Sequence, residues 1–332
     1  MDGDIFPLDE QLGLTRSGFS PEFSQQMVWL SALLPYAQCE QVLARIGERY
    51  VSASSIWHQT QTYGEALQAA VEHQQECVGV ERIQLPDARH DHNQRKGVSL
   101  DGGMVNIRAE GWREVKVGAV YDVTIRRERN PQTGELDELP QGVNVHYTAV
   151  LGSKERFTPA LWALAVAQHV PTARNRSVVA DGALWIWEVA EDVCPDGRQV
   201  VDWFHATQHL AEAAAALYPN DKDTKPRQRW LKTYRDHLYM GRVHLVIRAL
   251  KRRQRADLAT YFERHQRRMQ YLEFREEGIP IGSGTVESGV KQYKQRLTGP
   301  GMRWKRDHAE RMLVIRSAVL SNEFDALWQQ VA

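Results

Sequence analysis

The sequence predicts an α/β protein in which a mixed sheet is interrupted by a basic helical insertion and preceded by an amino-terminal helical domain. Three observations lead to this class. Apolar residues recur with a helical period over residues 21–78, and segments rich in Val, Ile and Tyr follow between residues 97 and 152. The stretch from Lys225 to Arg275 then holds fifteen Lys or Arg against four Asp or Glu, a balance of +11 in a chain of 332 residues with no net charge.

The amino-terminal helical domain is assigned to residues 1–94. Apolar residues share one helix face from Met27 to Ile46, Gly47 interrupts the pattern, and Ser52 suits the N-cap of a further helix. A helix, a short turn and a second helix are compatible with a helix-turn-helix that binds DNA. Three packed helices without affinity for DNA would give the same pattern, so both interpretations stay open.

The sheet is predicted to begin at residue 95. Residues 97–108, 113–125 and 143–152 are three strands of an antiparallel meander, and "ERNPQTGELDELPQG" is a polar turn region between the last two. A helix over 157–170, a strand ending at Asp181, a helix to Val193 and a short strand over 198–204 follow. This order of elements is that of a ribonuclease-H-like core. We assign its first part to residues 95–205, a basic helical insertion to 206–277 and its second part to 278–332.

Three acids fall at comparable points of this core. Asp101 lies in the first strand, Asp181 ends the fourth strand, and Glu287 lies in the first turns of a helix that begins after "GSG". In the ribonuclease-H-like arrangement the first and fourth strands are neighbours, and the late helix packs across their carboxyl edge. Clustered carboxylates are tolerated when divalent cations neutralise them, and hard oxygen ligands suit Mg²⁺. We therefore expect Asp101, Asp181 and Glu287 to hold two Mg²⁺ ions, with Mn²⁺ able to substitute.

Each acid taken alone also has a simpler explanation. An Asp before Gly is typical of a turn, and a Glu near a helix start complements the helix dipole. Asp202 and His205 stand three residues apart at the strand-to-helix junction that opens the insertion. We expect this pair to orient the helix start by hydrogen bonding rather than to bind metal.

Basic residues near Glu287 and in the insertion are candidates for contacting DNA phosphates. Two lysines follow Glu287 at helical spacing, where pairing with its carboxylate is the alternative role. Trp304 lies in a basic run after a Gly-Pro-Gly turn; it would either stack on an unpaired base or fill the core, and both interpretations stay open. The candidate DNA contacts are Lys291, Lys294, Arg303, Trp304, Lys305, Arg252, Arg253 and Arg255.

Four motifs resemble those of DDE-type insertion-sequence transposases, and of the ISKra-type group in particular. They are "SLDGGMV" around Asp101, "VVADGALWIW" around Asp181, "VVDWFHATQHL" around Asp202 and "GSGTVESGVKQYKQRLTGPGMRW" around Glu287. The segment "FPLDEQLGL" near the amino terminus is also similar, although the cysteine-pair zinc module that often precedes it in such proteins is not found before it here. The resemblance covers essentially the whole chain, and the last motif is the most specific.

The resemblance implies a metal-dependent enzyme that acts on DNA. Asp101, Asp181 and Glu287 would be its catalytic triad, and the basic helices would be the insertion commonly found between the second and third acids. Its partners would be the terminal inverted repeats of an element and a target DNA, and it would work as a homodimer or larger assembly on DNA. Such a protein would be cytoplasmic and associated with the nucleoid of a prokaryote.

The predicted reaction is hydrolysis of a phosphodiester at each element end, followed by strand transfer into target DNA. A transposase-derived nuclease without strand transfer and a domesticated DNA-binding regulator are the alternatives. No apolar run reaches the roughly 18–20 residues of a membrane span, and the acidic first residues predict neither a signal nor a transit peptide. The widely spaced Cys39, Cys77 and Cys194 predict reduced thiols and exclude a cysteine-based zinc site.

Overall fold

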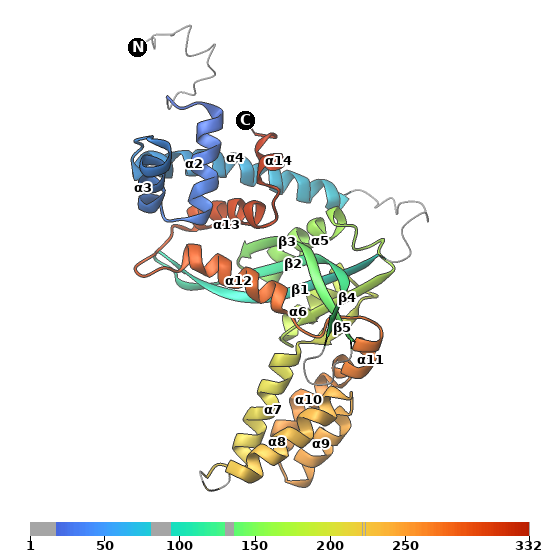
Figure 1. Ribbon diagram of the computed structural model, residues 1–332. Coiled ribbons are helices and arrows are strands. Elements are labelled where there is room, and N and C mark those ends of the chain that lie inside the picture. The colour runs from blue at the N-terminus through green and yellow to red at the C-terminus, as the bar shows by residue number, and fades with distance from the viewer. Residues whose placement is uncertain (1–17, 81–93, 130–135, 221, 223, 332) are drawn as a thin grey trace.

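The computed structural model describes residues 18–80, 94–129, 136–220, 222 and 224–331. Within them, five strands form one mixed sheet at the centre of the molecule (Figure 1). The strands are β1 (Arg95–Ile107), β2 (Gly111–Arg129), β3 (Leu136–Leu151), β4 (Asn175–Ala180) and β5 (Arg198–Val201), in the spatial order β3-β2-β1-β4-β5. The first three strands are antiparallel, and β4 runs parallel to both β1 and β5. The predicted meander and the predicted adjacency of the first and fourth strands are both confirmed.

The hairpin of β2 and β3 is longer than the sequence predicts. Most of the polar segment assigned to a turn continues the two strands, which reach Arg129 and resume at Leu136. Here the exposed Arg127 Nε and Glu138 Oε1 form an ion pair of 2.9 Å across the strands. A two-stranded ribbon beyond the core can expose both faces to water, so its polar composition was mistaken for a turn.

The two faces of the sheet carry different helices. Val98 and Leu100 of β1 belong to a core shared with α5 (Lys154–Ala167) and α6 (Leu184–Val193). Val105 and Ile107 belong to a core shared with α12 (Gly284–Leu297) and α13 (Arg306–Leu320). Because successive side chains of a strand alternate between faces, odd-numbered residues of β1, Asp101 included, face α12.

A helical lobe is inserted between β5 and α12, as predicted, and it projects away from the sheet in Figure 1. It consists of α7 (Trp203–Leu217), α8 (Thr224–Tyr239), α9 (Val243–Arg252), α10 (Ala256–Arg264), the 3₁₀ turn η2 (Gln266–Met269) and α11 (Tyr271–Glu276). We call residues 203–276 the inserted lobe. Its two ends meet, because the Trp203 N–H donates to the Ile281 carbonyl over 2.8 Å.

The amino-terminal helices are α2 (Pro21–Leu33), α3 (Tyr36–Gly47) and α4 (Ala53–Val80). Pro35 separates α2 from α3, so the helical face predicted as continuous belongs to two helices. The predicted cap of α4 is present, with the Ser55 N–H donating to Ser52 Oγ over 3.1 Å. None of the described helices combines the length and apolar character that a membrane span requires.

The amino-terminal helices share their core with the carboxyl-terminal end of the chain. Buried residues of α2, α4, α13 and α14 (Phe324–Trp328) form one cluster. Two buried arginines reinforce it at the end of α2: Arg296 Nε donates to the Ser31 carbonyl at 2.6 Å, and Arg316 Nη1 donates to the Ala32 carbonyl at 3.0 Å. The carbonyls at a helix end attract cations, so these contacts bind α2 to the core. The amino-terminal helices therefore share a core with the last two helices of the chain.

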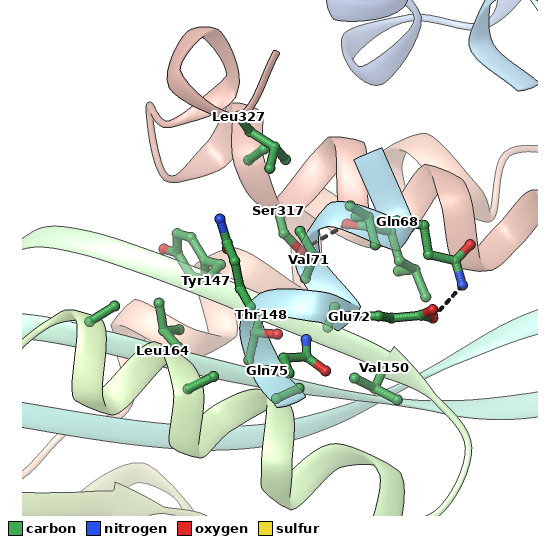
Figure 2. A pocket seen from close by; sticks show the side chains of 18 of the residues that line it. Gln68, Val71, Glu72, Gln75, Tyr147, Thr148, Val150, Leu164, Ser317 and Leu327 are labelled. Carbon is green, nitrogen blue, oxygen red and sulfur yellow. Dashed lines mark hydrogen bonds between the residues drawn. The ribbon is translucent and has the colours of Figure 1, made fainter. Parts of the chain in front are cut away.

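A groove of about 890 Å³ lies where α4, α5 and α13 meet the edge strand β3 (Figure 2). Apolar side chains such as Val71, Val150 and Leu164 line it together with the amides of Gln68 and Gln75. It lies against β3, whereas the three predicted acids lie on or beside β1, β4 and α12. The groove is therefore separate from the acids.

Candidate active site

Asp101 and Asp181 occupy matching places on two neighbouring strands. The pairing of β1 with β4 runs in parallel to Leu100 and Ala180, and an aspartate comes next in each strand. Parallel strands in register place the residues that follow a matched pair beside each other. The structure therefore brings these two predicted acids side by side, Asp101 midway along β1 and Asp181 directly after β4.

Asp101 faces α12 in an environment rich in charge. A Cβ built on Gly103, on the same strand face, would lie 3.4 Å from Lys294 Cε of α12. Partial burial raises the pKa of the Asp101 carboxyl above its usual value, although a hydrogen bond of 2.6 Å from the Gly102 N–H opposes this. The negative charge of Asp181 raises this pKa further, and Lys294 lowers it. The charges of Asp181, a predicted acid, and Lys294, a predicted DNA contact, therefore both act on the Asp101 carboxylate.

Asp181 sits in a tight turn between β4 and α6. One of its carboxylate oxygens accepts a hydrogen bond of 2.8 Å from the Ala183 N–H. Its carbonyl accepts another, of 3.2 Å, from the hydroxyl of Tyr261 in the inserted lobe. Gly182 follows with a φ of 104°, which a residue with a side chain rarely adopts. The Asp-Gly pair therefore does form a turn, and that turn sets the position of the carboxylate.

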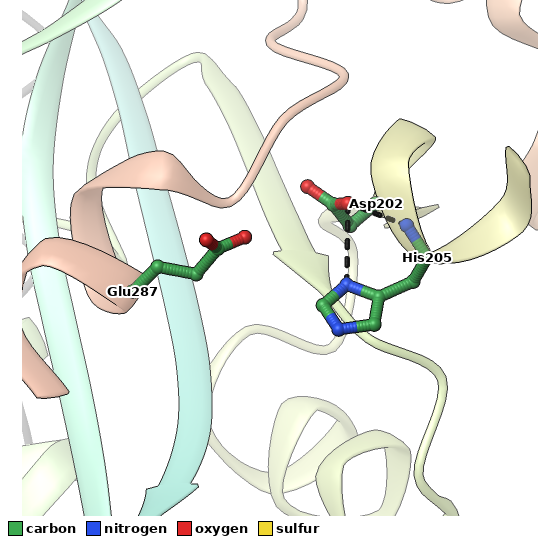
Figure 3. A group of neighbouring side chains, drawn as sticks. All are labelled: Asp202, His205 and Glu287. Atoms are coloured by element: carbon green, nitrogen blue, oxygen red, sulfur yellow. Dashed lines mark hydrogen bonds and ion pairs between the residues drawn. The ribbon is translucent and has the colours of Figure 1, made fainter. Parts of the chain in front are cut away.

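Glu287 stands in the first turn of α12, as predicted, and its side chain extends toward the junction of β5 and α7 (Figure 3). Ser283 Oγ, just before the helix, lies 3.2 Å from Glu287 Oε1 and 2.9 Å from a carboxylate oxygen of Asp202, so its single proton bonds to one of the two acids at a time. Lys291 Nζ lies 3.9 Å from Glu287 Oε2 and is largely exposed. The carboxylate is thus only lightly held by the protein.

Asp202 is fully buried and holds the junction together. Its Oδ1 accepts from the His205 N–H at 2.9 Å and from His205 Nδ1 at 3.2 Å (Figure 3). Its Oδ2 accepts from the Ser283 N–H at 2.5 Å and from Ser283 Oγ at 2.9 Å. Burial by itself raises the pKa of the Asp202 carboxyl, but the hydrogen bonds from His205 and Ser283 outweigh it and hold this pKa below its usual value. Asp202 caps α7 and joins it to the segment before α12. The hydrogen-bonding role expected for Asp202 is present.

His205 is closer to the acids than the sequence indicates. Ligand atoms of Asp202, His205 and Glu287 lie within 4.8 Å of one another, whereas Asp101 and Asp181 lie outside this group. The hydrogen bond to Asp202 raises the pKa of the His205 imidazole, and the charges of Asp181 and Glu287 add to this effect. Because protein donors already occupy both oxygens of Asp202, we interpret this trio as a hydrogen-bonded junction at the border of the acids.

The donor set of the three predicted acids fits a hard divalent cation. Asp101, Asp181 and Glu287 offer carboxylate oxygens, which Mg²⁺ prefers. Repulsion from Asp181 already raises the pKa of Asp101, and a bound cation would relieve that repulsion. The described residues thus fit the predicted metal in ligand type.

Trp304 is a core residue, which excludes the stacking role among its two predicted interpretations. Its side chain is 9% exposed, and its Nε1–H donates to the Leu297 carbonyl over 2.9 Å. Its backbone forms a parallel bridge with Ile107, which fixes the segment beside the end of β1. A ring that is buried and hydrogen-bonded in this way cannot stack on a base. Its neighbours Arg303 and Lys305 are exposed.

The three arginines predicted to bind DNA in the insertion differ in their surroundings. Arg255 forms a two-pronged ion pair with Asp257, with Nε–Oδ1 at 2.9 Å and Nη2–Oδ2 at 2.7 Å. Arg253 Nη2 donates to the Tyr218 hydroxyl over 2.6 Å. Arg252 is exposed, and no such bond is found for it within the described residues. A nearby carboxylate therefore offsets one of the three charges.

Most of the large apolar side chains at the start of the amino-terminal helices are internal. Phe19, Phe23 and Leu30 pack against the small core of these helices, which also contains Met27. Trp29 is 43% exposed. Three of these four large side chains therefore pack within the amino-terminal helices, and Trp29 is the one that faces solvent.

Sequence reasoning missed two residues of the site. Ser283 links Asp202 to Glu287, and Tyr261 bonds to the turn of Asp181. The "GSG" motif marked the place of Ser283 without indicating its partner. No signal in the sequence pointed to Tyr261, because its partner is 80 residues away.

A comparison with protein-family models finds no match, and a comparison with curated proteins finds no relative. The grounds for a function are therefore the sheet order, the placement of the acids and the distribution of charge. Of these, the placement of Asp101 and Asp181 on adjacent strands is the most specific.

Proposed function

We propose that this protein is a DNA transposase with a ribonuclease-H-like core, which hydrolyses phosphodiesters at element ends and transfers the ends to target DNA. The observation that carries the proposal is the matched position of Asp101 within β1 and of Asp181 directly after β4, on adjacent parallel strands. Glu287, on the helix that packs over β1, supplies the third carboxylate.

The topology supports the proposed core. Three antiparallel strands, then two strands parallel to the first, in the order β3-β2-β1-β4-β5, are what a ribonuclease-H-like sheet requires. The inserted lobe enters after β5 and returns before α12, so it separates the second acid from the third in the chain. The motif resemblance to DDE-type transposases predicts an insertion at this place.

Each residue of the site has a role in the proposed reaction. Asp101, Asp181 and Glu287 would hold Mg²⁺, which when bound activates the attacking oxygen and stabilises the leaving one. Lys294, exposed on α12 beside the strand face of Asp101, would contact a DNA phosphate and offset its charge. Asp202 and Ser283 keep α7 and α12 together, and so they hold His205 beside Glu287.

The charge of the inserted lobe supports DNA as the partner. Its balance of +11 between residues 225 and 275 suits a polyanion, and phosphate contacts of this kind bind without regard to sequence. We propose that two or more chains assemble on DNA, since joining two ends requires both to be held. A shared DNA raises the effective concentration of chains whose direct contacts are weak.

Cleavage of a duplex carrying the inverted repeats that bracket the gene tests the proposal. We expect cleavage in Mg²⁺ and a loss of about 1,000-fold or more in Asp181→Asn, because the metal contributes several kcal/mol to such a transition state. Asp196→Asn is the control, because the Asp196 side chain is 80% exposed and stands just before the start of β5, at the end of that strand away from Asp181. Equal cleavage by wild type and Asp181→Asn would overturn the assignment.

A second assay separates the transposase from its alternatives. Pre-cleaved repeat ends are incubated with a target plasmid, and we expect joined products in Mg²⁺. Cleavage without joining would instead identify a nuclease. Tight binding without either reaction would identify a DNA-binding regulator.

A further inference from the structure

We propose that the inserted lobe positions Asp181, and that Tyr261 is the positioning residue. The inference rests on the proposed function, in which Asp181 is a metal ligand. It adds a role for the lobe beyond binding phosphates, namely that seating of the lobe on the sheet sets the geometry of one acid.

The contact joins the lobe to the backbone of Asp181 itself. Tyr261 lies on α10, and its hydroxyl donates to the Asp181 carbonyl over 3.2 Å. The ring is held by two histidines of the lobe: His209 stacks on it with ring centroids 3.7 Å apart, and the centroid of His265 lies 4.9 Å away. An aromatic ring fixed by neighbours of this kind directs its hydroxyl without further loss of conformational entropy.

Gly182 shows how closely the lobe approaches this turn. A Cβ on Gly182 would lie 3.2 Å from the Tyr261 hydroxyl and 3.5 Å from His265 Nε2. The φ of 104° at Gly182 adds a second reason for glycine at this place. The turn is thus shaped to receive the ring of Tyr261.

Asp181 needs such support because it lies past the end of the strand ladder. The pairing of β4 with both neighbours ends at Ala180, whose carbonyl accepts from the Asp202 N–H at 2.7 Å. One residue further, the Asp181 carbonyl accepts from Tyr261. The bond from Ala183 is made to the carboxylate and shapes the turn locally, but it does not tie the turn to another element. Tyr261 supplies that tie.

The arrangement couples DNA binding to the site. DNA phosphates bound along the basic helices would set the position of the inserted lobe. Through Tyr261 on α10, the position of the lobe would in turn set that of the Asp181 turn. When the inserted lobe is docked on the sheet, Tyr261 holds the turn of Asp181 in position. When the lobe is displaced, that turn loses the hydrogen bond from Tyr261.

Amide hydrogen exchange of Tyr261→Phe tests this role. The substitution removes the hydroxyl and retains the ring that His209 and His265 hold. We expect amides in residues 181–184 to exchange about 2- to 10-fold faster, which corresponds to the loss of one hydrogen bond, while β4 stays protected. Tyr234→Phe is the control: its ring packs on Trp230 in the same lobe, and no hydrogen bond of its hydroxyl is found within the described residues.

The kinetics of DNA cleavage distinguish a positioning role of Tyr261 from a role in packing alone. For Tyr261→Phe we expect a lower cleavage rate at saturating DNA, an unchanged DNA affinity and a higher half-saturating Mg²⁺ concentration. Unchanged exchange at 181–184, or equal effects of the two variants, would overturn the inference. If wild type cleaves no DNA, the proposed function fails, and the exchange comparison still decides whether Tyr261 positions the turn.

Discussion

Replacing Asp202 removes the point where the inserted lobe and α12 are joined to the sheet. Its side chain is fully buried and accepts four hydrogen bonds from two residues, His205 and Ser283. In Asp202→Ala the buried Ser283 N–H loses its acceptor, at a cost of about 1–3 kcal/mol, whereas the Ser283 hydroxyl keeps Glu287 Oε1 at 3.2 Å. The lost cap of α7 adds about 1 kcal/mol. We therefore expect the free energy of unfolding to fall by about 2–4 kcal/mol.

Urea unfolding followed by tryptophan fluorescence measures this loss. Asp202→Asn should lose about half as much, because the amide keeps one acceptor and presents its NH₂ group to donors. Asp257→Ala is the matched control, since Asp257 also stands at a helix start but is 61% exposed and pairs with Arg255. An exposed pair of this kind contributes at most about 1 kcal/mol.

The loss should also depend on pH in one direction. The folded state holds the pKa of Asp202 below its usual value, so the carboxylate stabilises the protein fully above about pH 3.9, the ordinary value for Asp. As the pH falls further through the folded pKa, that contribution disappears. The gap between wild type and Asp202→Ala should therefore close in acid. A gap of less than about 1 kcal/mol at neutral pH, or one that widens in acid, would refute the reasoning.

Four further outcomes follow from the structure. Trp304→Ala should lower the free energy of unfolding by about 3–5 kcal/mol, while Trp112→Ala, at a side chain that is 57% exposed, changes it by under about 1 kcal/mol in urea unfolding. Gly289→Ala would place a Cβ 2.4 Å from a ring atom of Tyr147 on β3. We expect a loss of about 1–3 kcal/mol in the free energy of unfolding and slower DNA cleavage, because α12 must shift and carry Glu287 with it. Burial lowers the pKa of His265 to about 4, so wild-type stability should rise between about pH 4 and 6.5 and rise less in His265→Gln. Arg252→Gln should reduce the slope of log affinity for duplex DNA against log salt by about 0.9, as measured by fluorescence anisotropy.

The sequence predicts the sheet well because its signals are local. The apolar "VVA" run followed by Asp181 placed the end of β4, and segments rich in Val, Ile and Tyr placed β1 and its antiparallel neighbours. Parallel pairing of β1 with β4 then brings both acids side by side. For Asp101 and Asp181, the position in or after the strand is enough to predict which residues lie beside them.

Residues whose role depends on distant contacts could not be predicted in this way. Trp304 stands in a run of charged residues, and the sequence left both base stacking and core packing open for it. The structure decides for the core, with Ile107 on β1 and Leu297 on α12 as its neighbours. The contact of Tyr261 with Asp181 crosses from the inserted lobe to the sheet. Such contacts depend on how the helices pack against the sheet, and the helical spacing of apolar residues in the sequence does not reveal that packing.

The inserted lobe has several attachments to the sheet, and three of them lie beside the acids. At its root, the Trp203 N–H bonds to the Ile281 carbonyl, and Asp202 binds the segment that leads into α12. At its side, Tyr261 bonds to the turn of Asp181. A rigid rotation of the lobe must therefore act on the starts of both α7 and α12 and on that turn at once. The inserted lobe thus adjoins Asp181 through Tyr261 of α10 and Glu287 through His205 of α7, whereas β1 holds Asp101 within its ladder with β2. A fixed acid on the sheet and two acids that respond to the lobe are what a site requires if it is to be completed only when DNA is bound.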